Sequence, residues 1–209
     1  EDTGEPFLFS LETIPSFHTK STDCVVKVEA DVSQIKKIDS KFLELPIAPG
    51  SGKNSTIENC TANYGYYTKN TANGKYSHAE GASNSADGEC SHAEGFECSA
   101  TGFYSHAEGI GNKATGFYSH AEGGFGEASG YRAHSEGEHT KAIGDDSHSE
   151  GKGTIAKCKC QHVQGRYNVE DPTSYGMYAH IVGNGTDDDK RSNAHTLDWS
   201  GNAWFAGEV

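Results

Sequence analysis

The sequence has few of the branched aliphatic side chains from which globular cores are built. Only 33% of its 209 residues are hydrophobic, against the about 45–50% that is usual in globular domains. Between Tyr64 and Lys159, the whole supply of leucine, isoleucine and valine is Ile110, Ile143 and Ile155. Such a chain buries little apolar surface by itself, so a large single-chain core is excluded and packing against further copies is expected.

The charge balance limits the kinds of binding partner that are expected, and the cysteines indicate the compartment in which the chain assembles. Aspartate and glutamate (30) outnumber lysine and arginine (17), and the formal net charge is −13. Because phosphate binding needs clustered cations, nucleic acid is excluded as an expected partner. No segment reads as a signal peptide or as an apolar run long enough to cross a membrane, so no membrane insertion is expected. The six cysteines, which form no CxxC pair and favour assembly in a reducing cytoplasm, are Cys24, Cys60, Cys90, Cys98, Cys158 and Cys160.

In place of hydrophobic patterning, the sequence has a repeat of fourteen residues. The pentapeptide Ser-His-Ala-Glu-Gly, or a near copy, begins at Ser77, Ser91, Ser105, Ser119, Ala133 and Ser147, and in altered form at Gln161. The tenth place of each unit holds Ala86, Ala100, Ala114, Ala128, Ala142 and Ala156, and the twelfth holds Gly88, Gly102, Gly116, Gly130 and Gly144. Fourteen residues are too few for a pair of helices but suffice for two short strands and two turns with glycine at the turns. The repeat therefore predicts a thin parallel β-roll whose coils stack about 4.8 Å apart, and its unbroken register opposes the disorder that low hydrophobicity would otherwise suggest.

Composition divides the chain into four expected regions. Residues 1–45 contain alternating runs, such as 7–11 and 25–30, and are expected to form an N-terminal β segment with a connector. Residues 46–62 are rich in glycine, serine and asparagine and are expected to be a linker loop. Residues 63–165 are the β-roll, with Tyr64 and Tyr66 in the histidine and glutamate places of its first coil.

Residues 166–209 are expected to form a C-terminal β cap that ends the stack. Residues 179–183 resemble a copy of the pentapeptide displaced by four residues, and residues 194–198 are a candidate for one more. The sequence Ser200-Gly201-Asn202 predicts a hairpin turn. The apolar mass that the roll lacks is expected from Val163, Ile181, Val182, Leu197, Trp199, Trp204 and Phe205.

The pentapeptide predicts two columns of polar side chains along the roll. Strand alternation places histidine and glutamate on one face, and serine, alanine and glycine on the other. The first column is His78, His92, His106, His120, His134, His148 and His162. The second is Glu80, Glu94, Glu108, Glu122, Glu136 and Glu150, ending with Gln164.

Four interpretations of these columns stay open. They are a structural ladder in solvent or between chains, a metal site, an acid and base pair for catalysis, and a column that responds to pH. We expect the structural ladder, which sets coil register and subunit contacts, because a catalytic pair is normally unique in its site. No metal or other cofactor is expected.

Aromatic residues recur at the same step on another part of the coil. They predict a stripe along one edge of the roll, suited to packing between chains or to stacking on a sugar. The stripe, a candidate contact surface, is Phe103, Tyr104, Phe117, Tyr118 and Tyr131.

The motif Ser-x-Ala-x-Gly followed by Ala-x-Gly resembles the coil of trimeric autotransporter adhesin heads. The resemblance covers residues 63–165 and implies a left-handed parallel β-roll in a threefold bundle. The chain departs from that family by placing histidine and glutamate where those heads commonly carry aliphatic residues.

The C-terminal stretch resembles a different family. Residues 161–168, 178–185 and 191–209 (RSNAHTLDWSGNAWFAGEV) look like the junction of phage tail-fibre and tail-spike proteins that precedes or opens a self-cleaving intramolecular chaperone. Residues 38–43 are similar to a connector of phage tail proteins. The resemblance implies a virion part that ends at or near the start of an autoproteolytic region.

The resemblance assigns no catalytic residue, so the catalytic residues stay unknown. Ser192, Asn193, Asp198 and Ser200 are polar candidates for self-cleavage and are expected to be turn or cap residues. The aspartates at 187–189 lack the spaced oxygen ligands of a calcium loop and are expected to lie in a solvated loop.

Together these features predict an all-β homotrimeric segment of a phage or prophage tail fibre. It would extend the fibre, hold three chains in register and contact a host-cell receptor, with a glycan as one candidate. Its expected location is the virion tail, after assembly in the host cytoplasm. Two alternatives stay open: the head of a trimeric adhesin on a bacterial surface, and a self-processing fibre fragment, which would be an enzyme.

Overall fold

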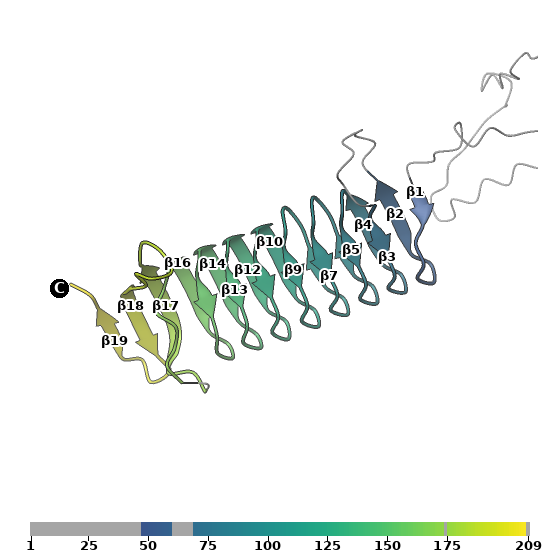
Figure 1. Ribbon diagram of the computed structural model, residues 1–209. Coiled ribbons are helices and arrows are strands. Elements are labelled where there is room, and N and C mark those ends of the chain that lie inside the picture. Colours follow the sequence, from purple (N-terminus) through teal and green to yellow (C-terminus); the bar gives the residue numbers. More distant parts are fainter. Residues whose placement is uncertain (1–46, 60–68, 174, 208–209) are drawn as a thin grey trace, which may run out of the picture. The chain divides into compact units, whose positions relative to one another are not determined.

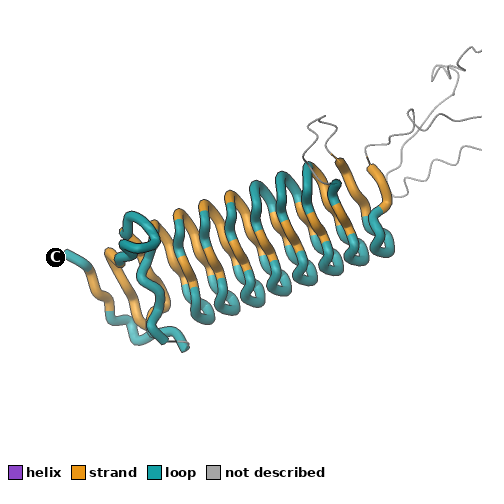
Figure 2. The backbone as a smooth tube through the Cα atoms, in the orientation of Figure 1, coloured by secondary structure: helices purple, strands orange, loops and turns teal. Residues whose placement is uncertain are grey.

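The computed structural model describes residues 47–59, 69–173 and 175–207. The expected N-terminal β segment and the connector at 38–43 lie outside these residues. The described residues belong to one compact unit, Glu44–Val209, and form a parallel β-solenoid (Figure 1). Figure 2 shows strands and turns alternating at a constant step, with no helix in the part of the chain that is described.

Each coil adds a strand to one or both of two sheets, here called the long sheet and the short sheet. The long sheet contains, in spatial order, β1 (Ile47–Pro49), β2 (Thr56–Asn59), β4 (His78–Gly81), β6 (His92–Ala93), β8 (His106–Ala107), β10 (His120–Gly124), β12 (His134–Glu138), β14 (His148–Lys152), β16 (His162–Arg166), β17 (Tyr178–Asn184), β18 (Asn193–Asp198) and β19 (Ala203–Phe205). The short sheet contains β3 (Thr71–Ala72), β5 (Ser85–Ala86), β7 (Ser99–Ala100), β9 (Lys113–Ala114), β11 (Glu127–Ala128), β13 (Lys141–Ala142) and β15 (Ile155–Ala156).

Strand pairing follows the sequence repeat. From β2 to β17 the long sheet is parallel, and its partners are equivalent residues of successive units, as His106, His120 and His134 illustrate. In the short sheet, Ala114 pairs with Ala128 in the same way. The fourteen-residue β-roll expected from the sequence is therefore confirmed.

Alanine fills the space between the two sheets. Small side chains at the third and tenth places let the sheets approach closely, and each is at most 1% exposed. They are Ala79, Ala93, Ala107 and Ala121 in the long sheet, and Ala72, Ala86, Ala100, Ala114, Ala128, Ala142 and Ala156 in the short sheet. Serine at the first place is also buried, and in four coils its hydroxyl has an internal acceptor, as where Ser119 Oγ donates to the carbonyl of Gly116 at 2.7 Å.

Glycine at the twelfth place is required by the contact between coils. A Cβ atom added to Gly116 would lie 2.0 Å from the carbonyl oxygen of Gly130 in the next coil. At the fifth place the requirement is conformational, since Gly109 has a φ of +99°, which side chains disfavour. Both glycine columns are therefore fixed by backbone geometry.

An asparagine at the eighth place holds the corner between the two sheets. Asn112 is fully buried; its Oδ1 accepts from the backbone N–H of Gly126 at 2.6 Å, and its Nδ2 donates to the carbonyl of Gly123 at 2.8 Å. Asn84 makes the equivalent bonds to Cys98 and Gly95. These amides satisfy backbone groups that would otherwise be buried without partners.

The first coil corrects two expectations. The expected linker loop at 46–62 contains strands β1 and β2, and β2 already belongs to the solenoid because Thr56 pairs with His78. The histidine and glutamate places of this coil are therefore held by Thr56 and Glu58, and the assignment of Tyr64 and Tyr66 to them was wrong. The reason is an insertion: the step from Thr56 to His78 is 22 residues, eight more than the repeat.

The C-terminal cap follows the expectation in part. Strand β17 is the displaced copy, since His180 pairs in parallel with His162. Residues 194–198 are not another coil, because β18 runs antiparallel to β17. The expected hairpin turn joins β18 to β19, with Asp198 N donating to the carbonyl of Asn202 at 2.9 Å.

Only part of the expected apolar mass lies in the interior of the cap. Val163 and Ile181 are fully buried and continue the alanine column. Trp199, Trp204 and Phe205 are 52–55% exposed, so their apolar mass lies on the surface of the cap and not in its interior. Strand β19 lies at the end of the sheet with no further strand in the described chain to cover it (Figure 1).

A buried carboxylate organises the passage from β16 to β17. Asp171 is 1% exposed, and its oxygens accept from the backbone N–H groups of Met177 at 2.6 Å, Tyr178 at 2.9 Å and Thr173 at 3.0 Å. Burial raises the pKa of this carboxyl, but these donors outweigh it and hold the pKa below its ordinary value. The last crossover is therefore fixed by one side chain.

Among the described residues, nothing forms a helix with the length and apolar character needed to cross a membrane. The described cysteines, Cys90, Cys98, Cys158 and Cys160, are free thiols.

Candidate functional site

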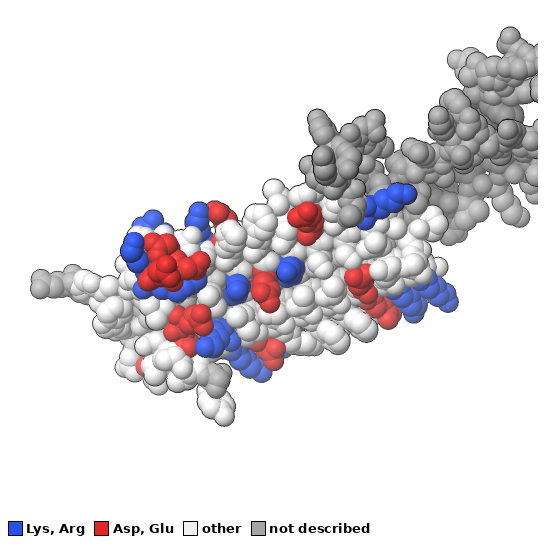
Figure 3. Space-filling view, in the orientation of Figure 1, with Lys and Arg blue, Asp and Glu red and all other residues white. Residues whose placement is uncertain are grey.

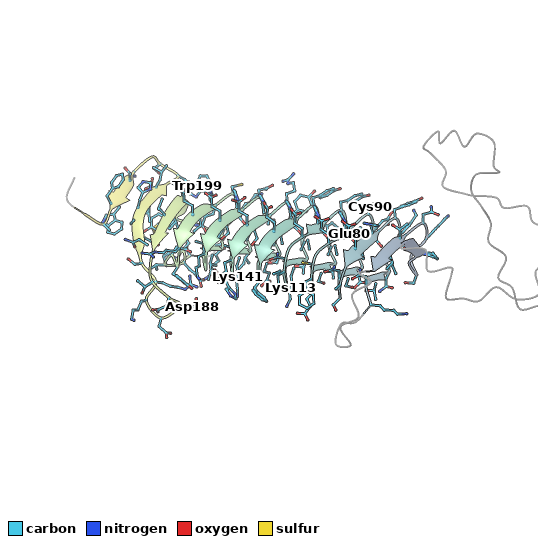
Figure 4. The ribbon with its side chains drawn as sticks, turned by 90° about the horizontal axis from the view of Figure 1, so that it is seen from above. Glu80, Cys90, Lys113, Lys141, Asp188 and Trp199 are labelled. Atoms are coloured by element: carbon cyan, nitrogen blue, oxygen red, sulfur yellow. The ribbon has the colours of Figure 1, made fainter. Side chains whose placement is uncertain are left out.

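The histidine and glutamate columns lie on the outer face of the long sheet. Because the third place of each coil is buried between the sheets, the second and fourth places point outward. Between 30% and 43% of each histidine side chain and between 30% and 38% of each glutamate side chain is exposed. Figure 4 shows Glu80 on the opposite side of the solenoid from Lys113 and Lys141 of the short sheet.

The histidine rings stack along most of the column, and only the first, His78, is tilted to its neighbour in that column. From His92 to His162, successive ring centroids are 4.6–4.9 Å apart and the planes differ by at most 9°. The column continues beyond the predicted residues, through His180 at 5.1 Å and His195 at 5.6 Å. The displaced copy at 179–183 was the sequence signal for the first of these.

Each glutamate lies beside the Nε2 atoms of the histidines. Three pairs are close, with Nε2 to Oε1 distances of 3.2 Å for His120 and Glu108, for His134 and Glu122, and for His162 and Glu150. Other glutamates lie between two rings: Glu136 is 3.9 Å from His134 and 3.7 Å from His148. The glutamate column is thus interleaved with imidazole nitrogens, which separates the carboxylates from direct like-charge contact.

Several of these nitrogens lack a partner. The Nε2 atoms of His92, His106 and His148 are buried and have no hydrogen-bond partner within the described chain. Burial, and then the neighbouring histidines, hold the pKa of His106 and His148 below the ordinary value. The pKa of His180 is lowered for the same reasons. All three rings favour the neutral form, and His106 and His148 also leave the hydrogen-bonding capacity of Nε2 unused.

We expect acid to destabilise the solenoid. Below about pH 6.5 an unfolded chain protonates these three histidines, whereas the folded chain resists until a lower pH. The unfolded state then binds more protons, so the free energy of unfolding falls as the pH drops below that value. Thermal melting followed by circular dichroism between about pH 7 and pH 5 measures the effect.

A variant with His106, His148 and His180 changed to glutamine should show a weaker pH dependence. The His139→Gln variant is the matched control, because His139 lies outside the ladder, stacked on Phe125 at 5.2 Å. A melting temperature that rises on acidification contradicts the expectation.

The predicted aromatic stripe is assembled as expected. The rings of Phe103 and Phe117 stack at 4.9 Å, those of Tyr104 and Tyr118 stack at 5.0 Å, and Tyr131 meets Tyr118 edge-on at 5.6 Å. All five side chains are 39–51% exposed. Each stacked ring covers one face of its neighbour, so part of the ring area is already used within the chain, and this arrangement suits packing between chains better than sugar stacking.

The polar candidates at the C-terminal end have structural roles. Asp198 accepts the backbone N–H groups of Ser200 and Asn202, both at 2.8 Å, and so caps the hairpin turn. Asn193 Oδ1 accepts from Val169 N at 2.8 Å. Ser192 is exposed, and its backbone N–H donates to the carbonyl of Tyr167 at 3.0 Å.

The aspartates at 187–189 do not converge on a common point. Asp187 pairs with Lys190 at 3.5 Å, and Asp188 pairs with Arg191 at 2.5 Å. Figure 3 shows charged side chains of both signs on the face in view, without a patch of one sign along the solenoid. The pairing agrees with a solvated loop rather than with a calcium site.

Comparison of the chain with protein-family models and with curated proteins finds no match.

Proposed function

We propose that this chain is a structural and host-contacting segment of a phage or prophage tail fibre, and that it works as a homotrimer in the virion tail. The observation that carries the proposal is an outward-facing histidine and glutamate ladder that repeats in six successive coils, from His78 to Glu150, on a roll whose apolar interior is almost only alanine. The likeness of the C-terminal stretch to tail-fibre junctions favours a virion part over a bacterial surface adhesin, which would share the same coil.

The thin interior supports the association of several chains. Alanine contributes little apolar area, so each coil gains little stability from its own core. Large apolar side chains remain on the surface instead, including Ile110 at 50%, Phe117 at 49% and Phe125 at 54% exposed. Contact with further chains would remove these side chains from water.

The difference between the two outer faces supports a partner of the same kind. On the short sheet the outward positions vary from coil to coil, for example Ser99, Lys113 and Glu127 in one column, as on a solvated surface. The long sheet repeats histidine and glutamate at every step of about 4.8 Å. A partner that meets every coil in the same way must have the same rise, and a second copy of this solenoid does.

The proposal predicts three chains per particle. Native mass spectrometry at micromolar protein should give a mass three times that of one chain, and electron microscopy should show straight rods. Labelled protein should then bind cells within a panel of bacterial strains and remain bound after washing. A folded single chain at the same concentration contradicts the proposal.

Changing His106 and His120 together to leucine should lower the melting temperature by about 5 °C or more, or lower the trimer fraction. Leucine cannot bond Glu108, so a half-buried carboxylate loses its partner at 3.2 Å. The matched control is Lys113→Leu with Lys141→Leu, on the exposed face of the short sheet. An unchanged melting temperature and trimer fraction would rule out a role of the ladder in subunit contacts.

A further inference from the structure

We propose that the ladder on the long sheet binds divalent first-row transition-metal ions between consecutive histidines, although the sequence alone led us to expect no metal. The proposal does not depend on the virion role. Each site would consist of two histidines from neighbouring coils and the glutamate between them. Zn²⁺ is a suitable ion with which to test such sites.

Five such groups lie along the described chain. In each, the two nitrogens and the carboxylate oxygen all lie within 4.8 Å of one another. The groups are His78, Glu80 and His92; His92, Glu94 and His106; His106, Glu108 and His120; His120, Glu122 and His134; and His134, Glu136 and His148.

The distances suit a metal ion after a small adjustment. Two ligands at 2.0–2.2 Å from a tetrahedral ion lie about 3.4 Å apart, and the His120 Nε2 to Glu108 Oε1 distance is 3.2 Å. The other ligand distances of this group are at most 4.8 Å, so the second histidine, His106, must approach by up to about 1.4 Å to reach tetrahedral spacing. An outward-facing imidazole can make this movement by rotating about its side-chain bonds, without moving the buried alanine column.

The unused nitrogens supply the second argument. The Nε2 atoms of His92, His106 and His148 are buried without a partner in the described chain, and together they belong to four of the five groups. A buried nitrogen without a partner is costly, and a metal ion would satisfy it.

The ligand set indicates the class of ion. Imidazole nitrogen suits Zn²⁺, Ni²⁺ and Cu²⁺, whereas Ca²⁺ and Mg²⁺ prefer a shell of oxygen ligands. Water can complete the coordination, since about a third of each side chain is exposed. The sites are therefore open and exchangeable rather than closed structural centres.

Sharing of histidines limits how many ions can bind. Neighbouring groups have one histidine in common, so an ion in one group blocks the next. The largest set of groups that share no histidine is the first, third and fifth. The chain can therefore hold at most three ions. Repulsion between doubly charged ions one coil apart favours the same alternation.

Chelator-treated protein is titrated with Zn²⁺ by calorimetry, and the ions are counted by native mass spectrometry. Because thiolates also bind Zn²⁺, the background carries Cys24→Ser, Cys60→Ser, Cys90→Ser and Cys160→Ser. We expect three ions per chain. Circular dichroism confirms that each variant keeps its fold.

Two sets of matched glutamine variants test the assignment. Changing Glu94 and Glu122 removes only the second and fourth groups and should leave three ions, whereas changing Glu80, Glu108 and Glu136 leaves two groups and should leave two ions. Changing all five should reduce Zn²⁺ uptake to background, while Glu127→Gln on the short sheet should not alter it. The proposal is overturned if the parent protein takes up no Zn²⁺, or if the fivefold variant takes up as much as the parent.

Discussion

Replacing Gly116 by alanine should destabilise the solenoid by about 3 kcal/mol or more, because the new methyl group has no space. Its Cβ would lie 2.0 Å from the carbonyl oxygen of Gly130 and 2.9 Å from that of Ser129. Both obstacles are backbone atoms of the next coil, so no side-chain rotation relieves the contact. The two coils must separate by more than about 1 Å at this point. This separation breaks the backbone hydrogen bonds between the coils in both sheets. Urea unfolding followed by circular dichroism measures the loss.

Gly124→Ala is the matched control, from the next coil. A Cβ at Gly124 meets nothing within 4 Å, and its φ is not positive. The free energy of unfolding of this variant should stay within about 0.5 kcal/mol of the parent value. Alanine meets no obstacle in the folded chain and restricts the unfolded chain slightly, which favours folding. Equal stability of the two variants would contradict the close contact between coils.

Replacing Asp171 by alanine should cost about 3 kcal/mol and release the C-terminal strands. The carboxylate accepts three backbone N–H groups, from Met177, Tyr178 and Thr173, and Thr173 Oγ1 at 3.0 Å. Without it these part-buried donors lose their acceptor, and the start of β17 loses its anchor. Hydrogen exchange of the amides in β17 and β18 should accelerate, while exchange in β8 and β10 should change little.

Asp189→Ala is the control for Asp171, because Asp189 is exposed in the loop after β17. Its effect should be within about 0.5 kcal/mol. The low pKa of Asp171 gives a second readout. The carboxylate stabilises the folded chain above about pH 4, and this stabilisation is lost as the pH falls through the lower pKa of the folded state. Unchanged exchange in β17 after Asp171→Ala would show that the crossover is held in another way.

The solenoid can be predicted well from the sequence, because each repeated residue is required by the local geometry of a coil and that geometry recurs in the next coil. Alanine at the third and tenth places and glycine at the twelfth are each required once per coil, so the requirement appears as a column. Alternation along the pentapeptide then places His106 and Glu108 on one face with no knowledge of the rest of the fold. The positions of the ladder and of the aromatic stripe both follow from the fourteen-residue step and from the alternation of side chains along each strand.

Other features could not be read from the sequence, because they have no fixed residue type. The fourteenth place adopts positive φ with Tyr104 and Tyr118 at 59° and Arg132 at 55°, although such residues rarely do so alone. The corner asparagines share one column with Cys98, Gly126, Thr140 and Thr154, and this mixture hides their common position. The first coil was misplaced because an insertion broke the period on which the prediction depended.

The insertion in the first coil shows where this architecture tolerates additional length. Between Asn59 and Asn70 the chain has ten residues, where the following coil has only Ala82 and Ser83, yet the strands on both sides keep their alignment. The opposite corner, with glycine carbonyls packed against the next turn, leaves no such freedom. New loops could thus be gained or exchanged at one edge during evolution without refolding the shaft, and a protein engineer could graft peptides there for display at a regular spacing.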